Sequence, residues 1–300
     1  MTVNTKNHRE ILEQTVNRKY RKRLIINKLV TVFTIIAVIA AIVPLCSILI
    51  EVVRNGISAI SFEFLTQPQG SIGSGGGGIA PAIQGTIIVV GLAAAIATPV
   101  GVLTGIYLTE FAKEGGTFPN AVRFFNDVLT GLPSIVIGIV GYVVIVLTVG
   151  SFSVVAGALS LSIIMMPIVV RVTEETLKVV PYSLREAGHS LGLSQAKITL
   201  FIVLPAAKEG ILTGIVVAIS RIAGETAPLI MTILGTSLFF SSFTAPVDAL
   251  PLRIWRLASQ PYESAHAFGW GSALILILMI LALSMGLRLL VQRKSLKTLT

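Results

Sequence analysis

The stretch "EAGHSLGLSQAKITLFIVLP", residues 186–205, decides the fold, because it is a polar segment set between long apolar runs. Pro181 begins a helical stretch and Gly192 interrupts it. One face of this first helix carries four small or apolar residues at helical spacing: Leu184, Ala187, Gly188 and Leu191. Ser194 is a plausible N-cap for a second short helix, which we expect to end before Pro205. The pattern predicts a helix–Gly–helix element outside a bilayer, whose small residues admit a partner surface; a merely solvated amphipathic loop is the alternative.

The regions on either side of this element are built for lipid. Only 12% of the residues are charged and the mean hydropathy is +0.88, whereas soluble domains carry about 25% charged residues. Apolar runs of the length that crosses a bilayer, roughly 20 residues, recur along the chain. We therefore predict an all-α integral membrane protein with six transmembrane helices, over 29–50, 79–108, 128–148, 152–171, 210–234 and 268–290. Spans three and four result from a fold-back at residues 148–151.

Basic residues give the orientation. With the N-terminus inside, nineteen of the 23 Lys and Arg residues fall on the cytoplasmic side, as the positive-inside rule requires. We predict a multi-pass protein of a prokaryotic cytoplasmic (inner) membrane with both termini cytoplasmic. Its parts would be a cytoplasmic tail (1–28), the first helix (29–50), an external Gly-rich loop (51–78), a core (79–290) with a cytoplasmic loop (172–209), and a second tail (291–300).

Several function classes are disfavoured by the sequence. The net charge of +9 follows from the positive-inside bias and does not indicate nucleic acid. Cys46 is the single cysteine, so neither an intrachain disulfide nor a cysteine metal cluster can form. The sequence contains no Walker A, HExxH or GxSxG motif. We therefore expect a transport protein that binds no metal or cofactor itself, and any energy from ATP would come from another chain. Glu110, Lys113 and Glu114 are interpreted as a solvated loop.

Glu186-Ala187-Gly188, Gly192 and then Ile202-Val203-Leu204-Pro205 resemble the EAA loop of importer ABC permeases, with Gly188 where that family commonly has Ala. In that family the loop forms a coupling helix that seats in a groove of the ATP-binding subunit. The resemblance assigns this role to residues 181–200. It implies that ATPase coupling depends on Glu186, Ala187, Gly188, Leu191, Gly192 and Pro205.

Four further stretches resemble the PstA-type permeases of phosphate-specific importers: "APAIQGTIIVV" (80–90), "GLPSIVIGI" (131–139), "RIAGETAPLI" (221–230) and "ALPLRIW" (249–255). The resemblance implies a MetI-like permease fold whose core is spans two to six. It also implies partners. These are a dimer of ATP-binding subunits that hold ATP and Mg²⁺, a homologous permease subunit, an external phosphate-binding protein and the lipid bilayer.

Arg221 and Glu225 are the only charges between residues 210 and 247. Arg221 would lie about 16 Å along the fifth span, at 1.5 Å per residue, where a charge costs about 2.5–3.5 kcal/mol. The i, i+4 spacing lets the two side chains pair, so one interpretation is an ion pair that fixes helix packing. The other is an anion site in the translocation pathway, including Thr226, where Glu225 orients the guanidinium and the planar Arg fork binds phosphate.

A one-to-one pair leaves no net positive charge, so an anion site needs a second cation. Arg171, at the inner end of span four, is the candidate, although ordinary positive-inside flanking also explains it. Glu225 could accept the proton that phosphate carries near neutral pH. The alternatives that remain are a permease for another oxyanion or small solute, and an ion-coupled transporter with Glu225 as its proton relay.

Overall fold

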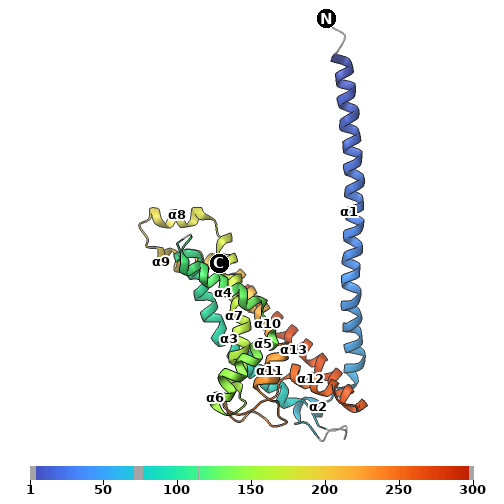
Figure 1. Ribbon diagram of the computed structural model, residues 1–300, viewed down its shortest axis with the longest axis vertical. Helices are drawn as coiled ribbons and strands as arrows, with labels where there is room; N and C mark the ends of the chain where they lie inside the picture. Colours follow the sequence, from blue (N-terminus) through green and yellow to red (C-terminus); the bar gives the residue numbers. More distant parts are fainter. Residues whose placement is uncertain (1–4, 71–76, 114, 297–300) are drawn as a thin grey trace. The chain divides into compact units, whose positions relative to one another are not determined.

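The computed structural model describes residues 5–70, 77–113 and 115–296 (Figure 1). The chain divides into two compact units, Met1–Arg54 and Asn55–Thr300. From Thr5 onward the first unit is part of a single helix, α1 (Thr5–Gly56), which contains the predicted first span. The polar segment predicted as a tail continues the same helix from Thr5 onward. Most of the glycine run expected in the external loop, residues 71–76, lies outside the described residues.

The described part of the second unit consists of helices and connecting loops, and it has two isolated bridges, Gln69 to Gly77 and Leu234 to Val247, but no strand. Its elements, in chain order, are η1 (Ile57–Ala59), α2 (Phe62–Thr66), α3 (Ala80–Ile106), η2 (Tyr107–Phe111), α4 (Thr117–Gly131), α5 (Ser134–Gly141), η3 (Tyr142–Val146), α6 (Leu147–Val149), α7 (Val154–Val179), α8 (Tyr182–Ser190), α9 (Gln195–Ile198), η4 (Thr199–Val203), α10 (Leu204–Ile222), α11 (Ala227–Thr232), α12 (Leu250–Ala258) and α13 (Glu263–Leu296). Three of them, η2, η3 and η4, are π-helical turns.

Among the residues that the structure describes, five helical segments are long and apolar enough to cross a membrane: Lys22–Ala59, Ala80–Phe111, Val154–Val179, Gln195–Ile222 and Glu263–Gly286. A sixth crossing requires the pair Thr117–Gly131 and Ser134–Val149, which is bent by 103°. The chain therefore has the number of spans that the sequence predicts, provided that the bent pair counts as one.

The bend corrects the predicted third span, which the sequence analysis gives as one helix over 128–148. Leu132 is extended, with ψ near 135°, and Pro133 follows it. Proline disfavours the helical conformation in the residue before it and cannot donate a backbone hydrogen bond, so α4 ends and α5 begins in a new direction. The fold-back after this span is confirmed, because Gly150 is left-handed with φ +76° between α6 and α7.

At Pro205, unlike at Pro133, the helix continues through the proline. The sequence predicts that a helix ends before it, but α9, η4 and α10 continue through it, so this prediction is wrong. Pro205 is the second residue of α10, and α10 follows the π-helical turn η4 directly. Proline is tolerated in the first turn of a helix, and a π-turn already displaces the regular backbone ladder. The helix also ends earlier than expected, at Ile222 in place of residue 234.

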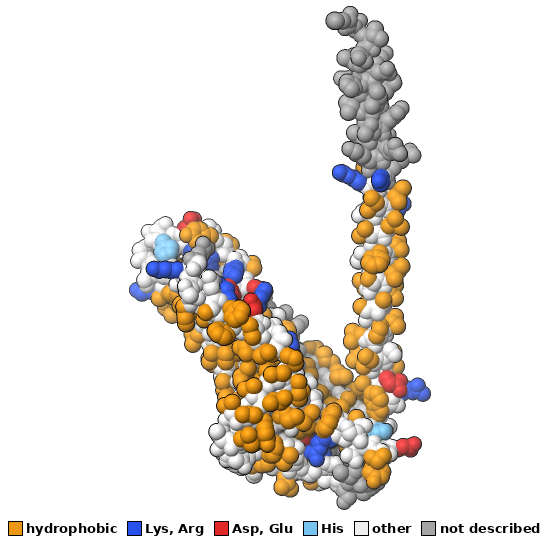
Figure 2. All heavy atoms as spheres, in the orientation of Figure 1, with side chains coloured by type: hydrophobic (Ala, Val, Ile, Leu, Met, Phe, Trp, Pro, Cys, Tyr) orange, Lys and Arg blue, Asp and Glu red, His pale blue; other side chains and the backbone are white. Residues whose placement is uncertain are grey.

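Helix α7 lies at the centre of the second unit and packs against α3, α10, α5, α4 and α11. Its closest neighbour is α3, and glycines make that approach possible. A Cβ on Gly101 would lie 2.8 Å from the Val169 side chain, and one on Gly105 would lie 2.6 Å from that of Thr173. Small residues at such contacts are typical of helices packed in lipid. Apolar side chains cover most of the face of the bundle shown in Figure 2, and charged ones gather at the end that carries α8.

This packing predicts opposite effects for two Gly→Ala changes in the same helix. Gly105→Ala forces the α3 and α7 backbones apart and should destabilise the protein by about 1–3 kcal/mol. Gly91→Ala has no atom within 4 Å of the new Cβ, so it should be neutral or stabilise the helix by up to about 1 kcal/mol. Thermal unfolding of the purified chain in detergent measures both, and equal shifts would contradict the close α3–α7 contact.

Candidate functional site

The conspicuous polar stretch 221–226 is a helix break. Helix α10 ends at Ile222, and the chain turns at residues 223–224 before α11 starts at Ala227. Gly224 weakens the helix and Pro228, the second residue of α11, permits a restart but no continuation. Gly138 of α5 lets this second helix pack closely, since a Cβ there would lie 2.8 Å from the Pro228 Cα. The expectation that Arg221 and Glu225 share one continuous helix is therefore wrong.

The break nevertheless brings the two charges together. Arg221 lies in the last turn of α10, where a cation complements the helix dipole. Its Nε lies 4.0 Å from Oε1 of Glu225, which is the limit of an ion pair. The two side chains differ in exposure, because 57% of the Arg221 side chain is exposed but only 19% of the Glu225 side chain is. Thr226 is half-buried beside them at the start of α11.

The guanidinium of Arg221 is little constrained. In the part of the chain that the structure describes, the pair with Glu225 is its only polar contact, and no hydrogen bond of normal geometry holds it. An Arg side chain carries five N–H donors. The arrangement therefore presents a cation with free donors on the surface of this chain, with the carboxylate set behind it.

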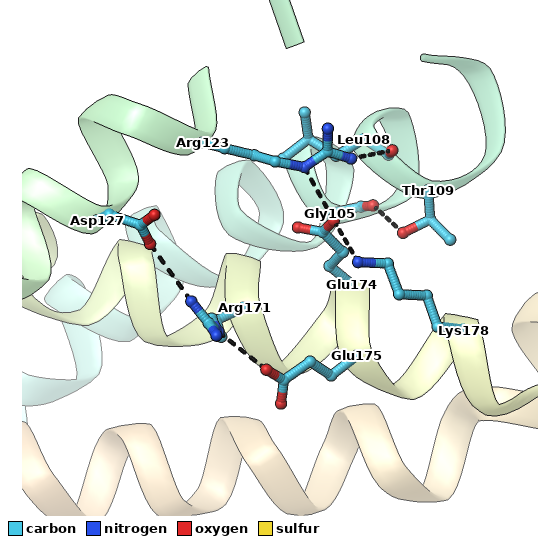
Figure 3. A network of polar contacts seen from close by, with 9 residues as sticks. All are labelled: Gly105, Leu108, Thr109, Arg123, Asp127, Arg171, Glu174, Glu175 and Lys178. Carbon is cyan, nitrogen blue, oxygen red and sulfur yellow. Dashed lines mark hydrogen bonds and ion pairs between the residues drawn. The ribbon is translucent and has the colours of Figure 1, made fainter. Parts of the chain in front are cut away.

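Arg171 is differently placed. It belongs to an ionic network between α4 and α7 (Figure 3), where its Nε donates to Glu175 at 2.8 Å and its Nη1 to Asp127 at 3.3 Å. In the same network Arg123 donates to Glu174 at 3.0 Å, and Lys178 donates to that same carboxylate at 2.7 Å. The network surrounds a cavity of about 220 Å³. Arg171 thus has two carboxylate partners and is neutralised locally.

The structure does not bring Arg171 to Arg221. Helices α7 and α10 pack with Val172 against Gly214 and Thr176 against Gly210. This antiparallel pairing puts Arg171 level with about residue 215, roughly 9 Å along the axis from Arg221 at 1.5 Å per residue. The hypothesis of a second cation at one shared anion site gains no support, and the role of Arg171 in the pathway stays a prediction.

The predicted helix–Gly–helix element is present as α8, the turn at 191–193 and α9. Helix α8 lies across the end of the bundle (Figure 1), and Glu186 and Ala187 are exposed on it. Leu191 is 78% exposed at its end. Gly192 adopts φ +72° with open space around it, and the amide of Leu193 donates to the Gly188 carbonyl at 3.2 Å. This is the left-handed C-terminal motif that favours glycine.

Two members of the predicted coupling set are placed differently from the expectation. Gly188 was expected to let a partner approach, but it is buried, and a Cβ there would lie 2.8 Å from Cγ1 of Ile198. Its small size therefore serves the packing of α8 on the following helix. Pro205 is exposed within the continuous helix that leads to α10.

Sequence reasoning missed two buried ion pairs. Glu110, interpreted as part of a solvated loop, has a side chain only 2% exposed and pairs with Arg185 of α8; Lys113 is exposed, as expected, and Glu114 lies outside the described residues. Arg253 is 2% exposed and donates from Nε to Asp248 at 2.6 Å. The sequence signal for this second pair is limited to the spacing of Asp248 and Arg253, which lie five residues apart on either side of "ALPL".

The Asp248–Arg253 pair holds the segment that follows α11. Burial raises the pKa of Asp248 and lowers the pKa of Arg253, while their mutual attraction opposes both shifts. The loss of solvation thus outweighs the attraction, as is common for a buried pair. Asp248 also follows Val247, which bridges to Leu234. The pair therefore fixes where the chain crosses between α11 and α12.

Comparison with known proteins gives consistent results. Residues 97–296 match the family described as binding-protein-dependent transport system inner membrane component. The chain is 38% identical to the phosphate transport system permease protein PstA of Haemophilus influenzae over 93% of this chain and 98% of that protein. It is 35% identical to the probable phosphate transport system permease protein PstA of Methanocaldococcus jannaschii over 83% of this chain and 87% of that protein.

A solved structure of the MetNI methionine ABC transporter in an inward-facing conformation is similar in fold. The TM-score is 0.56 at 17% identity, over 72% of this chain and 93% of that one. This likeness confirms the predicted fold class, an all-α membrane protein with the MetI-like permease fold.

The buried pair after α11 leads to a stability prediction. Arg253→Met leaves the Asp248 carboxylate buried without its partner and should cost about 3–5 kcal/mol. The double change Asp248→Asn with Arg253→Met removes both charges and should recover most of that loss in thermal unfolding. Arg256→Met on the same helix is the control with a smaller expected effect, because Arg256 is only half-buried. A double variant as unstable as the single one would contradict the pairing argument.

Proposed function

The chain belongs to the family of binding-protein-dependent transport system inner membrane components, and we propose that it is the permease subunit of an ATP-driven importer of inorganic phosphate. The observation that carries the proposal is the near full-length similarity to permeases named for phosphate transport in a bacterium and an archaeon. The helix break at 221–226 adds a chemical reason, since it presents a guanidinium with free donors on the surface of the bundle.

Arg221 would bind the phosphate. Its side chain is 57% exposed in the single chain, so it would face the pathway shared with a second, homologous permease subunit. The planar guanidinium can give two parallel charge-assisted hydrogen bonds to phosphate oxygens, and the Thr226 hydroxyl could add a third donor. Glu225 is largely turned away, and therefore would hold the guanidinium without facing the anion.

A second positive charge would have to come from outside this chain. The ion pair at 4.0 Å offsets part of the Arg221 charge, and Arg171 is occupied by Asp127 and Glu175. A homologous permease with its own basic residue at the matching break would supply the missing cation across the subunit interface. This requirement favours a permease dimer as the functional unit.

Helix α8 would dock on the ATP-binding subunits, which would hold ATP and Mg²⁺. Its exposed residues, among them Glu186, Ala187 and Leu191, would form the contact, and an external phosphate-binding protein would deliver the anion on the opposite side. Closure of the ATPase dimer would then move α8 and switch the helices between outward-open and inward-open states around the site near Arg221. Both termini and α8 would be cytoplasmic.

The proposal predicts that Arg221 is needed for transport and not for assembly. Arg221→Gln together with Glu225→Gln removes both charges, so the complex should assemble normally. ATP-driven uptake of phosphate by proteoliposomes that contain the permeases, the ATPases and the binding protein should nevertheless be lost. Lys208→Gln, which removes a cation from the other end of α10, should retain uptake.

Three other results would each refute part of this proposal. Near-normal uptake by the assembled double variant would make the pair purely structural. Uptake of another oxyanion or small solute in place of phosphate by the wild-type complex would correct the substrate. Uptake by the permease without ATPase, driven by a proton gradient and lost in Glu225→Gln, would favour an ion-coupled carrier.

Docking of α8 can be tested with two glycines that share the same backbone constraint. Gly192 at the end of α8 and Gly150 between α6 and α7 have φ values of +72° and +76°, and a Cβ added to either would have no atom within 4 Å. A leucine at either site should therefore cost a similar amount, about 1–2 kcal/mol. Only Gly192→Leu should weaken ATPase binding and ATP-driven uptake; equal uptake by the two variants would reject the docking role of the α8 end.

A further inference from the structure

The Glu110 carboxylate lies at a junction of four segments of the chain. Arg185 donates to it from Nη2 at 2.7 Å and from Nε at 3.3 Å, and Gln195 donates from Nε2 at 3.1 Å. The side chains of Glu110 and Arg185 are only 2% and 12% exposed. Buried, charge-assisted and forked contacts of this kind are the stronger hydrogen bonds in proteins.

The same side chains also bind backbone. Arg185 donates to the carbonyl of Val180 at 2.8 Å and to that of Leu177 at 3.0 Å, and Gln195 donates to the carbonyl of Glu110 at 3.3 Å. Leu177 lies in the last turn of α7, and its carbonyl also accepts a hydrogen bond from the amide of Val180 at 3.2 Å. The group formed by Glu110, Arg185 and Gln195, here called the clamp, therefore joins η2 after α3, the end of α7, α8 and the start of α9.

Little else attaches α8 to the ends of α3 and α7. Among the residues that the structure describes, Arg185 is the only residue of α8 whose side chain has a hydrogen bond or ion pair outside its own helix. The apolar contacts of Gly188 are with Ile198 and Ile202, on the α9–η4 side. A cavity of about 460 Å³, lined partly by Glu110, Lys178 and His189, lies beside the clamp. Packing therefore does not replace the clamp on the α3–α7 side.

We propose that Glu110, Arg185 and Gln195 form the mechanical link through which a displacement of α8 moves α3 and α7. The inference rests on the proposed function, because it concerns how ATPase closure reaches the membrane helices. With the clamp closed, α8 moves together with the ends of α3, α7 and the helix that leads into α10. With it open, α8 stays joined to α7 through the chain and to α9 and η4 through the chain and the packing of Gly188, and it moves without displacing α3.

The test compares ATP hydrolysis with phosphate uptake in the same reconstituted complex. The variants are Glu110→Gln, Arg185→Met and the double change. Each should still hydrolyse ATP, while phosphate imported per ATP hydrolysed should fall by roughly tenfold or more, within the range of typical coupling between sites. Glu209→Gln, an exposed carboxylate on α10, removes the same charge outside the clamp and should leave the ratio unchanged.

The double variant separates coupling from folding. Each single variant leaves a buried charge without its partner and should lower thermal stability. Glu110→Gln with Arg185→Met leaves neither charge, so stability and assembly should recover while the uptake-to-hydrolysis ratio stays low. A purely structural pair would regain both stability and transport, and that result would overturn the proposal.

The remaining outcomes are also decisive. A double variant that inserts but no longer binds the ATPase would overturn the clamp as a transmitter and make it part of the docking surface. A wild-type complex that hydrolyses ATP and imports no phosphate would overturn the proposed function, and the clamp proposal with it. Normal phosphate import by both the wild type and the double variant would overturn the clamp alone.

Discussion

Close contact between α7 and its neighbours is the constraint on which the rest of the second unit depends. Gly101 and Gly105 of α3 face Val169 and Thr173 on one side, and Gly210 and Gly214 of α10 face Thr176 and Val172 on the other. Within lipid, burial of apolar surface gives little drive for helix association, so van der Waals contact between closely packed backbones has to supply it. Branched side chains on α7 fill the space that the absent Cβ atoms of the glycines leave.

The polar features follow from this arrangement. Because α3, α7 and α10 are held closely together, their ends form one platform on which charged groups from distant parts of the chain meet. Arg123 of α4 reaches Glu174 of α7 across 51 residues of sequence, and Arg185 reaches Glu110 across 75. Both contacts lie near the C-terminal end of α7. The platform therefore carries the connection to α4 as well as the connection to α8.

The sequence predicted what depends on local composition. Long apolar runs predicted the spans, and Gly150 and Gly192 were correctly read as turns, since both have positive φ. The two prolines show the limit of such reasoning. Pro133 ends a helix because Leu132 before it is extended, whereas Pro205 is accommodated because a π-helical turn precedes it. Nothing in the neighbouring residue types distinguishes these cases, since the outcome depends on packing.

The burial and the partners of charged residues were even harder to predict from the sequence. Arg221 was singled out because it interrupts an apolar run, and the structure does place it at a break with Glu225 nearby. Glu110 and Arg253 were missed because each lies between two predicted spans, where charges are normally exposed. Their burial results from partners, or from chain crossings, that are specified only in three dimensions. The same reason explains why the hypothesis that paired Arg171 with Arg221 found no geometric support.

The two candidate functional regions lie at opposite ends of one helical rod. From Gln195 to Ile222 the chain is helical without a break, 28 residues in all, or about 42 Å at 1.5 Å per residue. Gln195 belongs to the clamp at one end, and Arg221 lies in the last turn at the other. The rod packs along α7 through glycines, with Val172 and Thr176 set against Gly214 and Gly210. A displacement that begins at α8 therefore has a continuous covalent path to the guanidinium, and the break at 223–226 is the first place along that path where the backbone can absorb it.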